Sequence, residues 1–368
     1  MDLYTNNIIP GWKKSLVASG LKWGRLLRLP LDATGLATLP STKDSANVGD
    51  TITYFQSTNR YRDIAFAPNG KDIFVVMDNS SATSGPGVAN PTTPACPGCL
   101  IKYSFLGYAD AGGVSTISDS IWTTTAAGGN CYTGTQITID ASNNYLWVPI
   151  TGPDGNIMAE INAMGQNLGV VNSSFYKTVP AFHASRSVSA TRYLDRNITI
   201  VPAVKTFGTP VKVRFYIPKG EFDSLVNDPL SGITAIANLK ILKNADLCSA
   251  TIGTPTTAVT PTVTASRGPS VPLTSNRGYV LQTTITDFTA NSSFYFAANN
   301  VVLPVDLVTF TGTLQNDLTT LLKWKTENEI NTARFEVERS IDGNNFSYIG
   351  NVAPKGSTSI YQRQLFIN

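Results

Sequence analysis

The sequence predicts an all-β protein, and three observations support this fold class. Short apolar runs separated by turn residues fill the chain from Trp12 to about Tyr108, without a convincing helical pattern. Apolar and polar residues alternate again later, at 136–139, 211–217 and 278–286, as in half-buried strands. In this later part, only Lys219 to Val226 is a plausible short helix. With 368 residues, the chain is long enough for two or three domains with separate cores.

The first region predicts antiparallel strands. A hairpin signal, Pro68-Asn69-Gly70-Lys71, lies between two alternating apolar runs. A segment rich in Ser, Gly, Pro and Thr, from Asn79 to Pro94, is expected to be a long surface loop. The runs that we expect to be strands are Leu26 to Leu31, Thr51 to Phe55, Ile64 to Ala67, Ile73 to Met77 and Leu100 to Phe105.

Two strand-like segments of this region carry cations that suit an anionic ligand. They run from Ser19 to Leu29, with Lys22, and from Asn59 to Phe66, with Arg60 and Arg62. Because successive side chains of a strand point to opposite faces, both arginines should project to one face, and Tyr61 and Asp63 to the other. Two guanidinium groups one pleat apart form a fork for a multiply charged anion. The alternative is a solvated pair on an edge strand.

The same segments carry a family resemblance. The order SGLKWGRLLRLPLD, YFQSTNRYRDIAFAPNGKDIFVVMDNS and CLIKYSFLGY resembles the last blades of the soluble PQQ-dependent glucose/sorbosone dehydrogenases, which are six-bladed β-propellers. The resemblance implies that residues 1–110 form a partial β-propeller, its C-terminal blades. It also implies that Lys22, Arg60 and Arg62 contact the cofactor PQQ, a tricarboxylate quinone.

Other parts of that family's site have no counterpart here. The general-base histidine and most calcium ligands of the family lie in blades that would precede this chain. The one histidine of the chain, His183, has no metal-ligand spacing around it. We therefore assign no catalytic and no metal-binding residue, and we expect the chain to be an inactive piece of a longer protein.

The four cysteines divide into two pairs. Cys96 and Cys99 form a Cys-Pro-Gly-Cys motif, which suits a redox motif, half of a zinc site or a local disulfide. A local disulfide fits best, because no second pair and no βαβ pattern lie nearby. Cys131 and Cys248 are most simply a long-range disulfide, typical of an oxidising compartment, with free buried thiols as the alternative.

Residues 120–302 are expected to form a β-sandwich module. The segment resembles modules of large surface proteins of Bacteroidetes, for which the resemblance implies no chemistry. Its aromatic side chains could stack on sugar rings, but in β modules such side chains more often belong to the core; they are Trp122, Tyr132, Tyr145 and Trp147.

Residues 303–368 resemble a fibronectin-III-like domain that often precedes the sorting signal of proteins exported by the type IX secretion system of Bacteroidetes. Trp324 would be the core tryptophan of an early strand, and Phe335 would begin the next strand. Asp342-Gly343 would form its turn. The domain is expected to be a truncated sandwich, because the sequence stops at Asn368.

Composition narrows the class of protein. Charged residues make up 14% of the chain, which suits an extracellular β-rich protein better than a cytoplasmic enzyme. The net charge of +3 comes without blocks of Lys and Arg, so nucleic acid is not an expected partner. No apolar run approaches the ~20 residues needed to span a bilayer. We expect an extracellular or outer-membrane-surface location, with cell-surface attachment.

Two functions are compatible with the sequence. In the first, the chain is part of a secreted or cell-surface PQQ-dependent sugar dehydrogenase, whose partners are a sugar substrate and an electron acceptor of unknown kind. In the second, it belongs to a non-enzymatic adhesin or carbohydrate-binding scaffold that retains a propeller. The residues upstream of this chain would distinguish them, because only the first function requires a histidine-bearing half of the cofactor site there.

Overall fold

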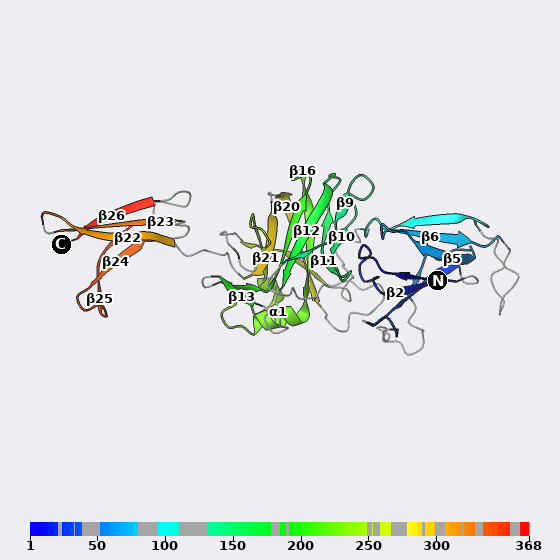
Figure 1. Cartoon of the computed structure of the whole chain (residues 1–368), viewed down its shortest axis with the longest axis horizontal. Coiled ribbons are helices and arrows are strands. Elements are labelled where there is room, and N and C mark those ends of the chain that lie inside the picture. Colours follow the sequence, from blue (N-terminus) through cyan, green and yellow to red (C-terminus); the bar gives the residue numbers. More distant parts are fainter. Residues whose placement is uncertain are drawn as a thin grey trace.

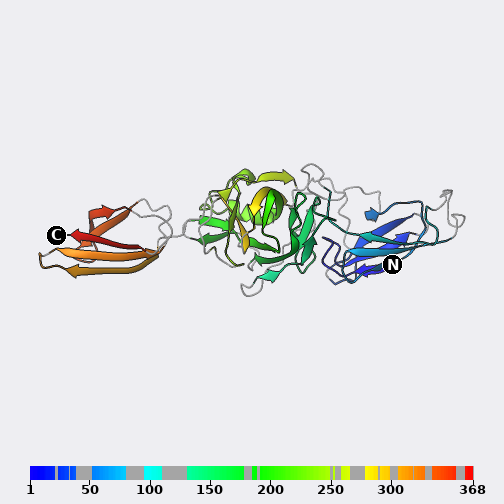
Figure 2. The same ribbon diagram turned by 90° about the horizontal axis from the view of Figure 1, so that it is seen from above.

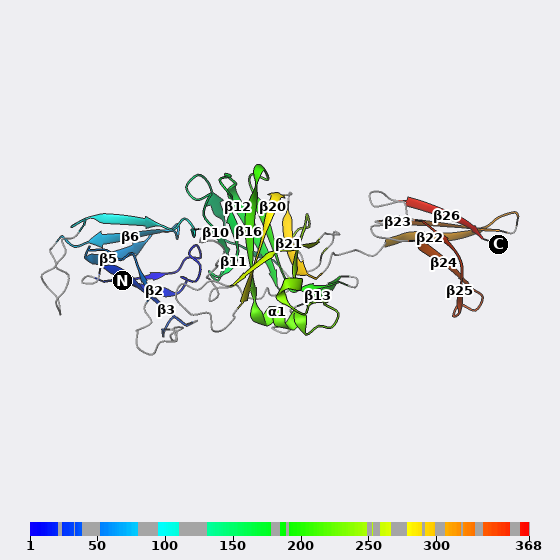
Figure 3. The ribbon, with the colours of Figure 1, turned by 180° about the vertical axis from the view of Figure 1, so that it is seen from behind.

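The protein is represented by a computed structural model with three groups of β-sheets (Figure 1), which Figures 2 and 3 show from above and behind. The all-β prediction is confirmed. Each group falls within one of the three predicted domains, whose boundaries stay predictions. The structure describes residues 1–20, 24–32, 34–38, 52–79, 95–109, 131–177, 185–188, 191–248, 252, 258–265, 278–288, 291–298, 306–317, 319–327, 334–353 and 361–367.

The first group has two antiparallel sheets, which share one core. The four-stranded sheet has the order β1 (Asp2–Tyr4), β2 (Ser15–Gly20), β3 (Arg25–Pro30), β4 (Ile52–Tyr54), and the three-stranded sheet has the order β5 (Tyr61–Phe66), β6 (Asp72–Met77), β7 (Leu100–Ser104). Apolar side chains of both sheets meet there, among them Val17 and Leu26 from the first and Tyr61 and Val75 from the second, together with Trp12 from the loop between β1 and β2. Each such buried side chain stabilises the fold by roughly 1.5 to 3 kcal/mol.

One expected strand is a hairpin. The segment from Ser19 to Leu29, expected to be strand-like throughout, contains the end of β2 and most of β3, which pair antiparallel with each other. The amide of Gly24, a residue with a φ of +54°, donates to the carbonyl of Gly20 at 3.0 Å. A Cβ atom there would lie 2.2 Å from the carbonyl oxygen of Ser57, so glycine is required both for its φ and for its close contact.

The second group is a β-sandwich. One sheet has the order β10 (Val148–Thr151), β11 (Ile157–Asn162), β16 (Thr206–Pro218), β20 (Gly278–Asp287), β19 (Thr262–Ala265). The other has the order β13 (Ser185–Val188), β14 (Thr191–Leu194), β21 (Ser292–Ala297), β15 (Arg196–Pro202), β12 (Gly169–Lys177), β8 (Tyr132–Thr133), with β9 (Ile137–Ile139) on β12, β17 (Lys240–Asn244) on β21 and β18 (Ala258–Val259) on β17. Side chains of both sheets form one large core, as Val213 and Phe215 of β16 and Phe294 and Phe296 of β21 illustrate.

Among the described residues, one α-helix accompanies the sandwich. α1 (Lys219–Val226) lies where the sequence predicted it and buries Phe222 and Leu225. A short 3-10 helix, η3 (Ile236–Asn238), follows it. Among the described residues, no helix has the length and apolar character that crossing a membrane requires.

The first group and the sandwich are joined by hydrogen bonds between residues far apart in the sequence. The amide of Gly11 donates to the carbonyl of Gly155 at 3.0 Å, and Thr151 Oγ1 donates to the carbonyl of Asn7 at 2.6 Å. Tyr108 and Trp147 exchange two backbone hydrogen bonds, at 2.9 and 2.8 Å. The loop between β1 and β2 therefore lies directly against the sandwich.

The third group has a smaller core. Its sheets are β22 (Asp306–Leu314), β23 (Thr320–Glu327), β26 (Tyr361–Ile367) and, separately, β24 (Phe335–Ser340) with β25 (Phe346–Val352). Trp324 is 3% exposed and packs with Leu322 and Val337, as expected of a core tryptophan. Gly343 has a φ of +75° in the turn between β24 and β25, where the sequence predicted a turn.

Candidate functional site

The predicted arginine pair lies at the start of β5. Arg60 comes directly before this strand, and its side chain is 6% exposed, whereas the side chain of Arg62 is 60% exposed. The strict alternation that we predicted is wrong here. Arg60 and Tyr61 are both buried, and Arg62 and Asp63 are both exposed.

The pairing of β5 with β6 explains this difference. Tyr61 lies opposite Met77, but Asp63 lies opposite Val76, so the register shifts at Arg62, as in a β-bulge. A bulge adds one residue to a strand and changes the direction of the side chains next to it. It turns the side chain of Arg62 toward solvent while that of Arg60 stays inside.

The two guanidinium groups nevertheless meet at one carboxylate. Arg62 Nη1 lies 3.3 Å and Arg60 Nη2 lies 3.8 Å from the same oxygen, Asp78 Oδ2. Asp78 follows the end of β6, and its side chain is 14% exposed. Among the described residues, two cations thus face this carboxylate, and the guanidinium of Arg62 is largely open to solvent. The arrangement can therefore attract an anion.

The Cys96–Cys99 disulfide, which confirms the predicted local pairing, lies beside Asp78. The amide of Gly98, inside this loop, donates to the carbonyl of Asp78 at 3.2 Å. The amide of Met77 donates to the carbonyl of Cys99 at 2.7 Å, and the amide of Cys96 donates to Asn59 Oδ1 at 2.7 Å. The loop thus contacts the residues before both Arg60 and Asp78.

Lys22 lies outside the described residues. Gly24, two positions later, contacts the segment that precedes Arg60, since the amide of Ser57 donates to the Gly24 carbonyl at 2.8 Å. A Cβ atom on Gly24 would also lie 2.6 Å from the carbonyl oxygen of Asn59. The β2–β3 hairpin therefore approaches the arginine pair, and a contribution of Lys22 to it stays a prediction.

An aromatic cluster borders this region. Tyr103 stacks on Phe55, with ring centroids 4.0 Å apart, and its hydroxyl lies 3.1 Å from that of Tyr61. Burial, followed by the hydrogen bond with Tyr61, raises the pKa of Tyr103 well above its ordinary value. Near pH 7 the hydroxyl of Tyr103 is therefore a neutral hydrogen-bonding group. No motif in the sequence marks this cluster, although all three residues lie in strand-like runs.

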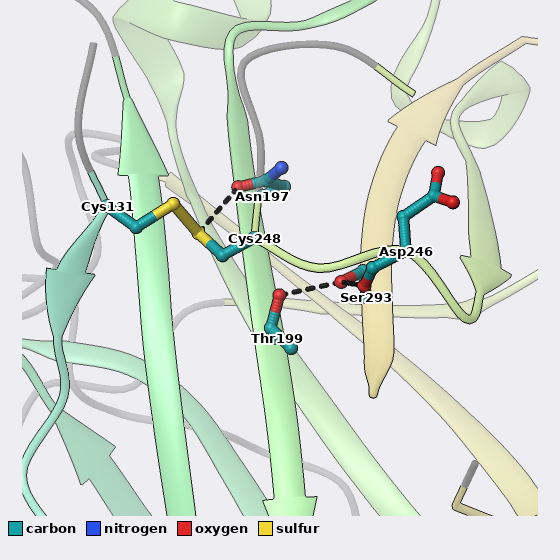
Figure 4. Close-up of a disulfide and its surroundings, with 6 residues drawn as sticks. All are labelled: Cys131, Asn197, Thr199, Asp246, Cys248 and Ser293. Carbon is teal, nitrogen blue, oxygen red and sulfur yellow. Dashed lines mark hydrogen bonds between the residues drawn. A yellow bond between two sulfur atoms is a disulfide. The ribbon is translucent and has the colours of Figure 1, made fainter. Parts of the chain in front are cut away.

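The second cysteine pair lies in the sandwich. Cys131 and Cys248 form the predicted disulfide, with their Cα atoms 6.2 Å apart. Figure 4 shows Asn197 beside it, and its Oδ1 lies 4.0 Å from Cys248 Sγ. Ser293 Oγ donates to the Asp246 carbonyl at 2.6 Å and lies 2.6 Å from Thr199 Oγ1, so the segment leading to Cys248 is also held by hydrogen bonds.

The structure buries one of the four aromatic residues that were considered for stacking on sugar rings. Trp147 is fully buried, and the guanidinium of Arg214 lies over its ring at 3.7 Å from the centroid. Tyr145 is 70% exposed. Trp122 lies outside the described residues. The core interpretation therefore holds for Trp147, and a glycan contact by the others stays a hypothesis.

His183 also lies outside the described residues. Within the part of the chain that the structure describes, no group of three or more His, Cys, Asp or Glu side chains comes close enough together to hold a metal ion.

A comparison with characterised proteins finds a relative for part of the chain. The chain is similar to quinoprotein glucose dehydrogenase B of Acinetobacter calcoaceticus, with 31% identity over 97 residues. The similarity covers 26% of this chain and 18% of the relative, so the chain spans less than a fifth of the relative's length. No protein-family model matches the chain, and no solved structure matches it. The comparison supports a segment that is quinoprotein-dehydrogenase-like.

Proposed function

We propose that residues 1–110 are the C-terminal blades of a quinoprotein sugar dehydrogenase and that Arg60, Arg62 and Lys22 bind its PQQ cofactor. The observation that carries this proposal is the convergence of two guanidinium groups on Asp78, one of which, that of Arg62, is 60% exposed and accessible to an anion. The similarity to a quinoprotein glucose dehydrogenase supports it independently.

The described residues fit a cofactor of this kind. PQQ carries carboxylates, and the planar donors of arginine bind a carboxylate through two parallel hydrogen bonds. Arg62 offers an exposed guanidinium for such a contact, and Arg60 adds a second positive charge close to it. When bound, PQQ would supply a quinone that accepts a hydride from the carbon bearing a sugar hydroxyl or from a hemiacetal carbon. The residues of this chain bind and orient the cofactor, and the base belongs to the blades that we expect upstream.

The other two groups of sheets serve display and attachment in this proposal. The sandwich at 120–302 and the fibronectin-III-like domain at 303–368 belong to a protein on the extracellular or outer-membrane surface, exported by a type IX system of Bacteroidetes. Two disulfides support an oxidising compartment. A sugar is the substrate and the electron acceptor is unassigned, and the 368-residue chain by itself oxidises no sugar.

A second function is favoured by one observation. Asp78 already supplies a carboxylate to both arginines, and a structural ion pair has the same appearance. In that case the chain is part of a non-enzymatic adhesin or carbohydrate-binding scaffold, and the arginine pair only stabilises the turn after β6.

Titration of PQQ distinguishes the two functions. In the longer protein that we expect to contain this chain, Arg60→Ala/Arg62→Ala should weaken PQQ binding by several kcal/mol, since each charge-assisted contact contributes roughly 1.5 to 3 kcal/mol. The matched control is Arg192→Ala/Arg334→Ala, which removes the same charge from ion pairs with Asp228 and Glu336 elsewhere. Equal affinities of the wild type and the Arg60/Arg62 variant would support the scaffold.

A further inference from the structure

The two arginines share a single carboxylate oxygen, and this geometry gives Asp78 a role of its own. Guanidinium groups on neighbouring positions repel each other unless an anion stands between them. Asp78 Oδ2 lies between them, 3.3 Å from Arg62 Nη1 and 3.8 Å from Arg60 Nη2. We propose that Asp78 is the positioning residue of the arginine pair and that the Cys96–Cys99 loop fixes Asp78 in place. The identity of the anion bound by the pair rests on the proposed function; the positioning does not.

The backbone of Asp78 is held from two sides. Its amide donates to the carbonyl of Arg60 at 2.8 Å, which joins the carboxylate-bearing residue directly to one of the two arginines. Its carbonyl accepts from the amide of Gly98 at 3.2 Å, inside the disulfide loop. The preceding residue, Met77, donates its amide to the carbonyl of Cys99. The position of the carboxylate therefore depends on the conformation of the loop that the disulfide closes.

The Cys96–Cys99 loop is also hydrogen-bonded to the segment that precedes β5. The amide of Cys96 donates to Asn59 Oδ1, and Asn59 is 5% exposed and directly precedes Arg60. One covalently closed turn thus contacts the chain on both sides of the ion pair, next to Arg60 and next to Asp78. Such a turn reduces the conformational freedom of the three charged groups before any ligand arrives, which is the usual source of preorganised binding.

Two roles for Asp78 predict opposite effects on anion binding. If Asp78 only competes with the ligand for the arginines, removing its charge should strengthen binding, because two positive charges would then face the anion. If Asp78 positions the arginines, binding should weaken although the local charge becomes more positive. The sign of the change in affinity therefore separates the two roles.

The first experiment needs no cofactor. In the 368-residue chain, phenylglyoxal modification of Arg60, followed by mass spectrometry, reports how firmly this buried guanidinium is held. We expect Asp78→Asn and Cys96→Ser/Cys99→Ser to raise the rate several-fold, and hydrogen exchange at the amides of Met77 and Gly98 to rise in the cysteine variant. Cys131→Ser/Cys248→Ser, which removes the disulfide of the sandwich, is the control and should leave the Arg60 rate unchanged under conditions in which circular dichroism shows an intact fold. Wild-type rates in both site variants, with circular dichroism showing intact folds, would overturn the proposal.

The second experiment uses PQQ and the longer protein. Asp78→Asn should weaken PQQ binding by about tenfold, the equivalent of one charge-assisted contact. Asp78→Glu, which keeps the charge but moves the carboxylate by one methylene, should also weaken it. Tighter binding by Asp78→Asn, together with wild-type affinity of Asp78→Glu, would show that Asp78 is only a competing charge. If the Arg60/Arg62 variant binds PQQ as the wild type does, the proposed function fails, whereas the modification rate of Arg60 still decides the role of Asp78.

Discussion

The sandwich and the first group of sheets both bury an arginine beside a carboxylate, but the two ion-pair sites differ in their exposure to solvent. In the sandwich, Arg214 and Glu160 are 1% and 0% exposed, Trp147 covers the guanidinium, and Tyr216 Oη donates to Glu160 at 2.6 Å. In the first group, Asp78 serves two arginines, and Arg62 is mostly exposed. A fully enclosed pair is typical of structural stabilisation, whereas the exposed guanidinium of Arg62 is accessible to a ligand.

The two disulfides differ in a similar way, since that of the sandwich is structural for its whole module and that of the first group acts locally. Cys131–Cys248 closes a loop with a sequence separation of 117, whereas Cys96–Cys99 has a separation of 3. In the chain-entropy account, the longer loop restricts the unfolded chain far more. The sandwich disulfide therefore stabilises its module globally, and the small loop acts chiefly on the residues that it contacts.

The largest expected effect comes from the sandwich disulfide. Cys131→Ser/Cys248→Ser should lower the free energy of unfolding of the sandwich by about 4 to 5 kcal/mol, and Cys96→Ser/Cys99→Ser should lower that of the first group by only about 2 kcal/mol. Urea denaturation followed by tryptophan fluorescence measures both losses. Equal losses in the two variants would remove the distinction between the disulfides.

The buried ion pair should give the next largest effect. Glu160→Ala leaves Arg214 as a charge enclosed without that carboxylate and should cost about 3 to 5 kcal/mol of unfolding free energy. Asp78→Ala should cost less, because water solvates Arg62 once the carboxylate is gone. Denaturation of the two variants under the same conditions tests the difference. A greater loss for Asp78→Ala would mean that the exposed pair, too, is chiefly structural.

The smallest effect concerns alkaline pH. Burial raises the pKa of Tyr4 to about 12, although hydrogen bonds with the backbone of Ile9 and Ile8 lower this pKa in part. The unfolded state therefore loses this proton at lower pH than the folded state, so stability is full below about pH 10 and falls as the pH rises toward 12. Stability curves of the wild type and Tyr4→Phe should differ in slope within this window only. Parallel curves for the two proteins would contradict the assignment of this loss of stability to Tyr4.

Much of the fold could be predicted from local patterns. Alternating apolar residues indicated the strands around Val211 and Tyr279, and α1 lies at its expected residues because Phe222 and Leu225 share one face of a short helix. These strands and this helix depend on near neighbours in the sequence, where period and residue type suffice. Trp324 was expected in the core for another reason, the resemblance of residues 303–368 to a fibronectin-III-like domain.

The geometry of the arginine site could not be predicted in the same way. Asp78 follows a strand and carries no motif, and its role arises from the pairing of β5 with β6. The shift of register at Arg62 depends on that pairing too, so strict alternation was the wrong expectation. Glu160 was missed because a charged residue within a strand normally indicates an exposed position, and here other parts of the molecule enclose it.

The hydrogen bonds between the loop after β1 and the sandwich affect how the chain can be dissected. A cut anywhere between Tyr108 and Cys131 would separate Gly11 from Gly155, Asn7 from Thr151, and Tyr108 from Trp147. Each half would then expose backbone groups and apolar surface that the intact chain keeps away from water. Shortened versions of this protein should therefore retain both groups of sheets together, even though the sequence alone suggests a convenient place to divide them.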